Sequence, residues 1–168
     1  MLKIIVLFIH ICFFKKAPQD IPYSKWFFGL ILSINIAISL LVLNISTGLF
    51  SSLLQVPVGI LLILGSVYLV LLFARRMERF YQTATALLGV DTLISLCALP
   101  VLGTAMMGQE GAGKSYLILL ALMIWHWAVT GHIFRHALSS TLSFGLGLSF
   151  LYFFVSYQVM TILFPSVF

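Results

Sequence analysis

The sequence predicts an all-α integral membrane protein: a bundle of five transmembrane helices preceded by a short interfacial helix. Three observations support this fold class. Of the 168 residues, 62% are hydrophobic and only 8% are charged, whereas about 25% of residues in soluble domains carry charge. Several apolar segments reach the roughly 20 residues that a helix needs to cross a bilayer. Basic residues gather in alternate gaps between these segments, a pattern typical of cytoplasmic loops.

Residues 1–25 are predicted to form the interfacial helix and a connector. The apolar stretch from Leu2 to Phe14 is too short to cross the hydrocarbon core at about 1.5 Å per residue. It is apolar nearly all round, so we expect a short helix that lies on the cytoplasmic surface, dips into it or packs against the bundle. Pro18 and Pro22 follow and predict a non-helical connector at the depth of the lipid headgroups.

Residues 26–168 are predicted to form the five-span transmembrane domain. Each segment has helical length, and none shows the short alternating pattern of a transmembrane barrel. The predicted spans cover about residues 26–48, 53–74, 84–106, 116–134 and 142–164. The connecting loops are short, so any function must be carried out within the bilayer or at its immediate surfaces.

The basic residues predict the orientation. Residues 1–25, 75–83 and 135–141 hold all of the lysines and arginines except Lys114. The positive-inside rule therefore predicts a cytoplasmic N-terminus and an outer C-terminus, in a multi-pass protein of a cell inner membrane. Besides Lys3, the basic residues on this side are interpreted as topology signals or headgroup contacts: Lys15, Lys16, Lys25, Arg75, Arg76, Arg79 and Arg135.

A glycine-rich loop matches a phosphate-binding motif. The segment Gly108 to Ser115 fits the pattern G-x-x-x-x-G-K-S, which binds phosphate when it follows a strand and opens a helix. Here both flanks are predicted spans, and the loop is predicted to face away from the cytoplasm. We therefore expect no nucleotide and interpret the segment as a flexible connection. Nucleic acid is not expected either, because the cations mark helix ends rather than one basic face.

Asp91 is the only acid inside a predicted span. A charge there costs about 2.5–3.5 kcal/mol, so it should face the bundle and have a partner. Counting from the cytoplasmic ends places one polar group of each span in a layer about 10–14 Å deep, at about 1.5 Å per residue. Asp91 and His126 form its clearest pair. The layer also contains Asn35, Ser66 and Ser149, with Thr130 one turn from His126.

Two interpretations of this polar layer stay open. In the first, the side chains hydrogen-bond across helices and hold the bundle together. In the second, they form a proton or ion site, because ionisable groups within membranes are typical of ion pathways. Five short spans without an obvious repeat differ from the inverted repeats of transporters, and this favours the structural interpretation.

Two histidines four residues apart, His132 and His136, fall on one face at the end of the fourth span. This spacing can ligate a metal, but a third ligand is missing nearby, so no metal or haem is expected. Cationic side chains near a helix C-terminus complement the helix dipole, which accounts for their position.

The architecture resembles the Yip1-like membrane domain. Five spans, an inner N-terminus, tiny loops and a short outer C-terminus carry this resemblance. The segment from Pro18 to Ser24 is also similar to one in small uncharacterised proteins of Gram-negative bacteria. The resemblance implies a partner-binding or scaffolding protein. The chain lacks the long N-terminal region and the tyrosine-glycine-proline type signature of the eukaryotic members, so their trafficking role is not carried over.

We therefore expect a non-enzymatic accessory or scaffold subunit, which contacts a larger membrane partner or another copy of itself through its helices. The alternative is a small transport or proton-relay component that uses the layer around Asp91 and His126. No cofactor is expected. No Ser/His/Asp or paired-carboxylate site can be assembled, because Asp20, Glu78 and Glu110 lie at loop positions.

Overall fold

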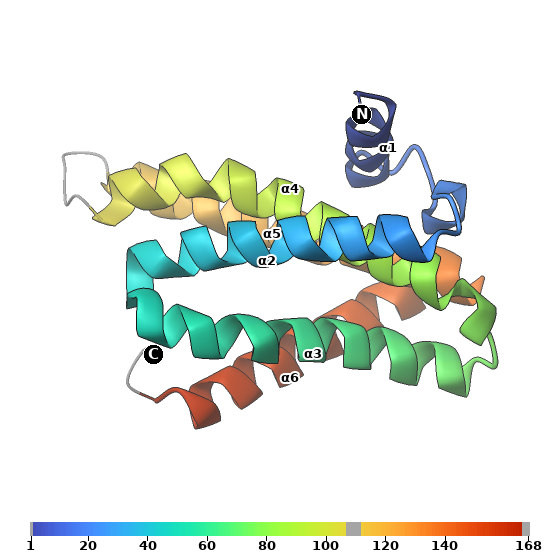
Figure 1. Ribbon diagram of the computed structural model, residues 1–168. Helices are drawn as coiled ribbons and strands as arrows, with labels where there is room; N and C mark the ends of the chain where they lie inside the picture. Colours follow the sequence, from blue (N-terminus) through green and yellow to red (C-terminus); the bar gives the residue numbers. More distant parts are fainter. Residues whose placement is uncertain (1, 107–111, 166–168) are drawn as a thin grey trace.

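The computed structural model describes residues 2–106 and 112–165, and over these residues the chain folds into helices without strands (Figure 1). Five helices are long and apolar enough to cross a membrane. This confirms the predicted helical class and the predicted number of candidate spans. The helices are α2 (Lys25–Thr47), α3 (Leu49–Phe73), α4 (Phe80–Met106), α5 (Ala112–Leu138) and α6 (Leu142–Leu163). A shorter helix, α1 (Leu2–Cys12), and two 3-10 turns, η1 (Pro18–Asp20) and η2 (Met77–Arg79), complete the fold.

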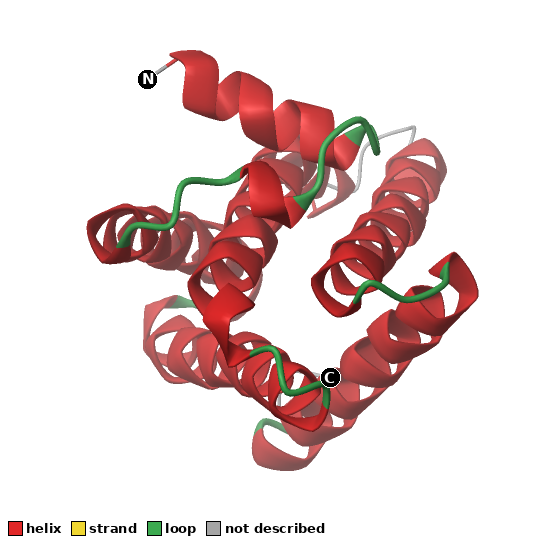
Figure 2. Cartoon of the chain, turned by 90° about the vertical axis from the view of Figure 1, so that its right-hand side faces the viewer, coloured by secondary structure: helices red, strands yellow, loops and turns green. Residues whose placement is uncertain are grey.

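The long helices form two layers, which are clearest when the bundle is viewed along its axis (Figure 2). One layer contains α2, α4 and α5, with α4 in contact with both neighbours. The other contains α3 and α6, and α1 lies on the opposite side of the first layer. Because α4 also contacts α1 and α3, it is the central helix of the bundle.

Helix α4 begins at Phe80 rather than near residue 84, and α5 continues to Leu138 rather than residue 134. The predicted spans end at polar residues because hydropathy falls there. In the structure these polar residues have hydrogen-bond partners, so the helices continue past them. The side-chain amide of Gln82 donates to the carbonyl of Ile21 at 2.8 Å. One guanidinium nitrogen of Arg79 donates to the carbonyls of His136 and Ala137 at 3.2 and 3.1 Å, which satisfies the C-terminus of α5.

A single residue, Gly48, connects α2 to α3. It has φ +80° and ψ 163°, a conformation that is essentially restricted to glycine. The chain therefore reverses direction between two spans without a loop.

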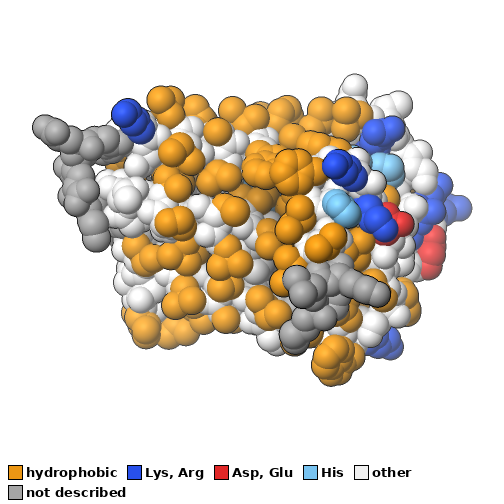
Figure 3. All heavy atoms as spheres, turned by 90° about the horizontal axis from the view of Figure 1, so that it is seen from above, with side chains coloured by type: hydrophobic (Ala, Val, Ile, Leu, Met, Phe, Trp, Pro, Cys, Tyr) orange, Lys and Arg blue, Asp and Glu red, His pale blue; other side chains and the backbone are white. Residues whose placement is uncertain are grey.

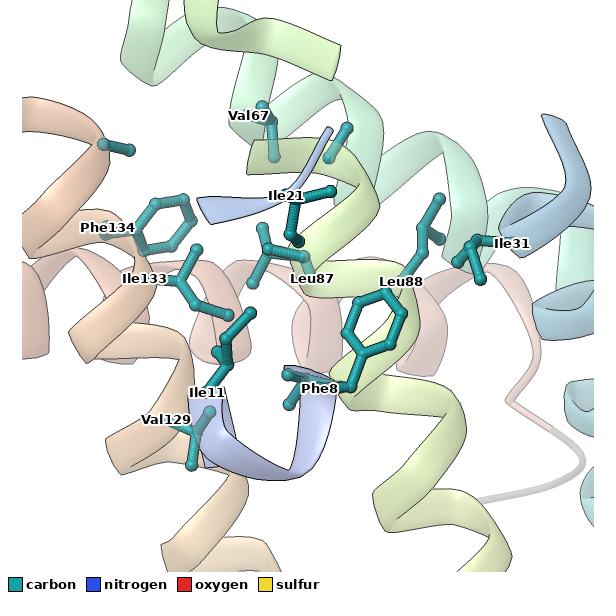
Figure 4. Packing of buried hydrophobic residues seen from close by; sticks show 14 of the residues in the cluster. Phe8, Ile11, Ile21, Ile31, Val67, Leu87, Leu88, Val129, Ile133 and Phe134 are labelled. Carbon is teal, nitrogen blue, oxygen red and sulfur yellow. The ribbon is translucent and has the colours of Figure 1, made fainter. Parts of the chain in front are cut away.

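Helix α1 crosses α4 and α5 and packs against them (Figure 4). The ring of Phe8 lies directly on Gly89, where there is no room for a β-carbon. Ile11 and Cys12 are buried, and the indole N–H of Trp125 donates to the carbonyl of Cys12 at 3.0 Å. Gly89 lies about 13 Å along α4 from Phe80, at about 1.5 Å per residue. Of the three placements expected for this segment, the structure shows packing against the bundle.

Helices α5 and α6 approach each other closely through small residues. A β-carbon at Gly145 would collide with the carbonyl of Gly131 and lie 2.9 Å from the backbone nitrogen of Arg135. The hydroxyl of Ser149 donates to the carbonyl of Trp127 at 2.9 Å. Small residues thus allow a backbone-to-backbone contact, as is common between membrane helices.

Replacing Gly145 with Ala should push α6 away from α5 and destabilise the protein by about 1–3 kcal/mol, the usual cost of overpacking. The matched control is Gly147→Ala, because a β-carbon at Gly147 meets nothing within 4 Å. Thermal unfolding of both variants in detergent measures the difference. Equal melting temperatures would show that the close contact between α5 and α6 is absent.

The docking of α1 predicts the reactivity of Cys12. Burial, with a smaller contribution from Cys97, raises the pKa of the Cys12 thiol from 9.0 to about 11. Only the thiolate reacts, so alkylation near neutral pH should be about a hundredfold slower than for a free thiol, and should accelerate as the pH rises towards 11. The experiment uses a Cys97→Ala background with a maleimide reagent. Phe8→Ala should release α1 and restore ordinary reactivity, whereas fast labelling without this change would contradict the docking.

Candidate functional site

All five long helices line a partly open cavity of about 240 Å³. It extends from Asp91, near the middle of α4, towards the end of the bundle that contains Gly48, since Leu43, Gln55 and Met160 also line it. Its wall combines apolar side chains with polar groups from every span. The polar residues are Asn35, Ser39, Gln55, Asp91, His126, Tyr152 and Ser156.

The carboxylate of Asp91 is the centre of this cavity. One of its oxygens, Oδ2, accepts a hydrogen bond from the side-chain amide of Asn35 at 2.8 Å. The other, Oδ1, lies 3.7 Å from Nε2 of His126. This distance exceeds that of a hydrogen bond but allows a single bridging group. The side chains of Asp91 and His126 remain 22% and 20% exposed, so both can contact a bound molecule.

Asn35, on the wall of the cavity, connects α2 to α4. Its side chain is 1% exposed, and its amide nitrogen also lies 3.2 Å from the carbonyl of Leu88 and 3.1 Å from the hydroxyl of Thr92. The amide nitrogen has two hydrogens, and three acceptors surround it. The contact with Asp91 is the shortest, and a charged acceptor makes it the strongest.

Three polar side chains near the cavity carry a buried atom without a hydrogen-bond partner among the described residues, namely the hydroxyls of Thr130 and Ser156 and the side-chain nitrogen of Gln55. Thr130 is fully buried beside a smaller recess that Asp91 and His126 also line. Gln55 is 3% exposed and lines the part of the cavity nearest Gly48. Buried polar groups without partners are rare, and those that occur call for an explanation. Their positions suit a cavity that holds a polar molecule.

The structure therefore brings together four of the residues predicted to form the polar layer, namely Asn35, Asp91, His126 and Thr130. Ser66 and Ser149 do not join them. The hydroxyl of Ser66 donates to the carbonyl of Ile63 in its own helix, and Ser149 binds the backbone of α5. Counting residues along a helix predicts the depth of a side chain in the membrane. It does not predict which face of the helix the side chain lies on.

Sequence reasoning missed Ser39, Gln55, Tyr152 and Ser156. A helical spacing could have found two pairs, because Asn35 and Ser39, and likewise Tyr152 and Ser156, are four residues apart and share a face. Gln55 escaped notice because the predicted layer was set by depth from the cytoplasmic side, and Gln55 lies towards the opposite end of α3.

Most of the basic residues gather at the end of the bundle opposite Gly48, called here the basic end, and Lys114 in the first turn of α5 is an exception (Figure 3). Figure 3 also shows a broad apolar surface between the two ends. Arg76 donates to the hydroxyl of Ser139 at 2.7 Å, and the ammonium of Lys25 lies 5.9 Å from the ring centre of Tyr81. Five other basic residues predicted to mark this side are Lys15, Lys16, Arg75, Arg79 and Arg135. Lys15, Lys16 and Arg75 are exposed.

His132 and His136 lie in contact, with ring centres 4.5 Å apart, and Nε2 of His132 lies 3.1 Å from the carbonyl of Lys16. Within residues 2–106 and 112–165, no three His, Cys, Asp or Glu side chains group as metal ligands would. The first half of the phosphate-loop match, residues 108–111, lies outside the described residues. Its last residues start α5, where the hydroxyl of Ser115 lies 3.1 Å from that of Thr104.

Replacing Asn35 with Leu should destabilise the bundle by about 1–3 kcal/mol, because it leaves the carboxylate of Asp91 without its donor. Ser33→Leu is the control, since Ser33 is exposed and bonds only within α2. Adding Asp91→Leu to Asn35→Leu should cost less than the sum of the single changes, because the partners are lost together. Unfolding free energies in mixed micelles measure the coupling, and strict additivity would argue against the hydrogen bond.

Comparisons with protein-family models, with curated proteins and with solved structures find no match for this chain. The resemblance to the Yip1-like membrane domain stays a prediction. What the cavity binds therefore has to follow from the residues that line it.

Proposed function

We propose that this protein is a small transport or proton-relay component that binds a polar or ionic solute within the membrane. The observation that supports this function best is the position of Asp91. The only acid inside the spans lies on the wall of a cavity to which all five spans contribute. A purely structural carboxylate would be expected to be enclosed by its partners, whereas this one is partly exposed to the cavity.

Asp91 and His126 are suited to proton transfer. Carboxylates and imidazoles form the proton relays of many pumps and transporters, because both groups gain and lose a proton readily. The 3.7 Å between Oδ1 of Asp91 and Nε2 of His126 can be bridged by one water molecule. Asn35 holds the other carboxylate oxygen, which fixes the direction in which Oδ1 points.

In the proposed orientation the basic end faces the cytoplasm of a cell inner membrane. This assignment rests on the positive-inside rule. The cavity then lies on the outer side of Asp91. Buried side chains fill the bundle on the inner side, among them Leu87, Ile133 and Phe134 (Figure 4). In this proposal the conformation is open towards the outer half and closed towards the cytoplasm.

Proton flux in liposomes tests the proposal. Purified protein is reconstituted around a pH-sensitive dye, and a pH step is applied outside. Asp91→Asn keeps the shape of the side chain but removes its proton site, so the flux should fall by about a hundredfold, as when a catalytic acid or base is lost. Glu78→Gln is the control, because Glu78 is an exposed acid in η2, next to Arg79 of the basic end.

Two results would contradict the proposal. One is a flux from the unmodified protein equal to that of empty liposomes across a panel of small cations and protons. The other is a folded Asp91→Asn protein with unchanged flux.

A scaffold or accessory role is the second candidate, and the exposed face of α6 favours it. Phe150, Phe154 and Tyr157 are 63%, 52% and 57% exposed, and together with Trp127 of α5 they line an apolar groove. Aromatic side chains are frequent at the centres of protein interfaces. If this role is correct, gentle detergent purification should yield a stoichiometric membrane partner or a homo-oligomer, and Phe150→Leu with Phe154→Leu should weaken that association.

A further inference from the structure

We propose that the cavity receives its ligand from the lipid, through the seam between α3 and α6, and that this ligand is an amphiphile with a cationic head group. The inference rests on the proposed function, because it uses the same cavity and names the class of molecule that would occupy it.

The first observation is an apolar groove on the outside of the α3–α6 seam. The groove has a volume of about 400 Å³, and its walls include Leu61, Leu69 and Phe73 of α3 and Leu151 and Val155 of α6. All five side chains are exposed, Phe73 by 85%. An alkyl chain lying in the bilayer can therefore reach this groove directly.

The second observation is that the groove and the cavity are adjacent. Leu62, Tyr152 and Ser156 line both of them. The apolar groove outside and the polar cavity around Asp91 thus lie on opposite sides of the same three side chains. In this proposal the ligand passes between them when Tyr152 rotates.

The packing of α3 against α6 is loose on the groove side. A β-carbon at Gly59 would lie 3.5 Å from the terminal methyl of Met160, which marks the close contact near the Gly48 end. A β-carbon at Gly65, on the wall of the groove, meets nothing within 4 Å. The seam is therefore closed at one end and open beside the groove.

The charge of the cavity selects the head group. Asp91 and His126 are its ionisable members apart from the phenol of Tyr152. When the carboxylate of Asp91 is ionised and the imidazole of His126 is neutral, the cavity carries one negative charge, which attracts a cation. An ammonium group has three donors. The carboxylate of Asp91 and the hydroxyls of Ser39 and Ser156 are acceptors that the cavity provides.

The alkyl tail of the ligand determines its route of entry rather than its affinity. Lipid is as apolar as the groove, so moving an alkyl chain between them gains little free energy. Binding strength should therefore depend on the head group and Asp91. The route should depend on the shape of the groove.

The experiment uses the full chain in zwitterionic liposomes. The rate at which an added brominated alkylammonium quenches tryptophan fluorescence measures entry, and its displacement by dodecylamine measures affinity. Phe153 lines the cavity with its ring centre 5.1 Å from that of His126. The quenching that Phe153→Trp adds to that of the native tryptophans therefore reports on occupation of the cavity. Gly65→Leu fills the open groove and should slow the entry of the alkylammonium by about tenfold or more, with little change in its affinity. It should leave the binding rate of methylammonium, which needs no groove, unchanged. Gly147→Leu is the control, because that position also has open space but lies outside the groove.

The outcomes separate the claims. Equal rates of alkylammonium entry in Gly65→Leu and Gly147→Leu would overturn the lateral route. Binding of dodecanoate as tight as that of dodecylamine would overturn the cationic head group. If Asp91→Asn abolishes proton flux while Gly65→Leu has no effect on alkylammonium entry, only this inference fails. If Asp91→Asn changes neither flux nor binding, the proposed function fails as well.

Discussion

The hydrogen bond from Asn35 to Asp91 is the interaction on which the centre of this bundle depends. An acid inside an apolar helix needs a donor, because lipid supplies none. Asn35 supplies it from α2 at 2.8 Å, and this bond fixes the rotation of α2 against the central helix α4. With one carboxylate oxygen occupied, the other is directed to His126 on α5. The cost of the charge within the membrane thus determines which faces of three helices meet.

Around this centre, the remaining helices pack in different ways. Helix α6 approaches α5 by backbone contact at Gly145, while on its other side it leaves the seam with α3 partly open. Helix α1 fills the surface between α4 and α5 with Phe8 and Ile11. Helix α1 therefore packs tightly against the layer of α2, α4 and α5. The seam between α3 and α6 is packed loosely. The binding role is inferred from the cavity around Asp91 together with the loosely packed seam between α3 and α6 beside it.

Much of the fold could be predicted because lipid imposes simple rules on sequence. Length and hydropathy define five helices, and the cost of a buried charge identifies Asp91 and predicts its closeness to His126. The composition of the site and the docking of α1 depend on the rotation of each helix about its axis and on contacts between distant segments. The rules on length, hydropathy and buried charge do not predict these. Ser66 has the predicted depth but a different face, and Gln55 reaches the cavity from a depth that was not considered. The contact of Phe8 with Gly89 joins segments far apart in the chain, and the sequence around either residue gives no sign of it.

The central claim is that a cavity open to small polar molecules lies beside Asp91 inside the bundle. The most direct test is the reactivity of Ser39→Cys in a chain without Cys12 and Cys97. Ser39 lines the cavity, whereas Ser33 of the same helix is exposed on its outer face. A small water-soluble methanethiosulfonate should modify the cysteine at 39 much faster than one at 33, because a thiol in lipid does not ionise. Equal and slow modification at both positions would contradict the account.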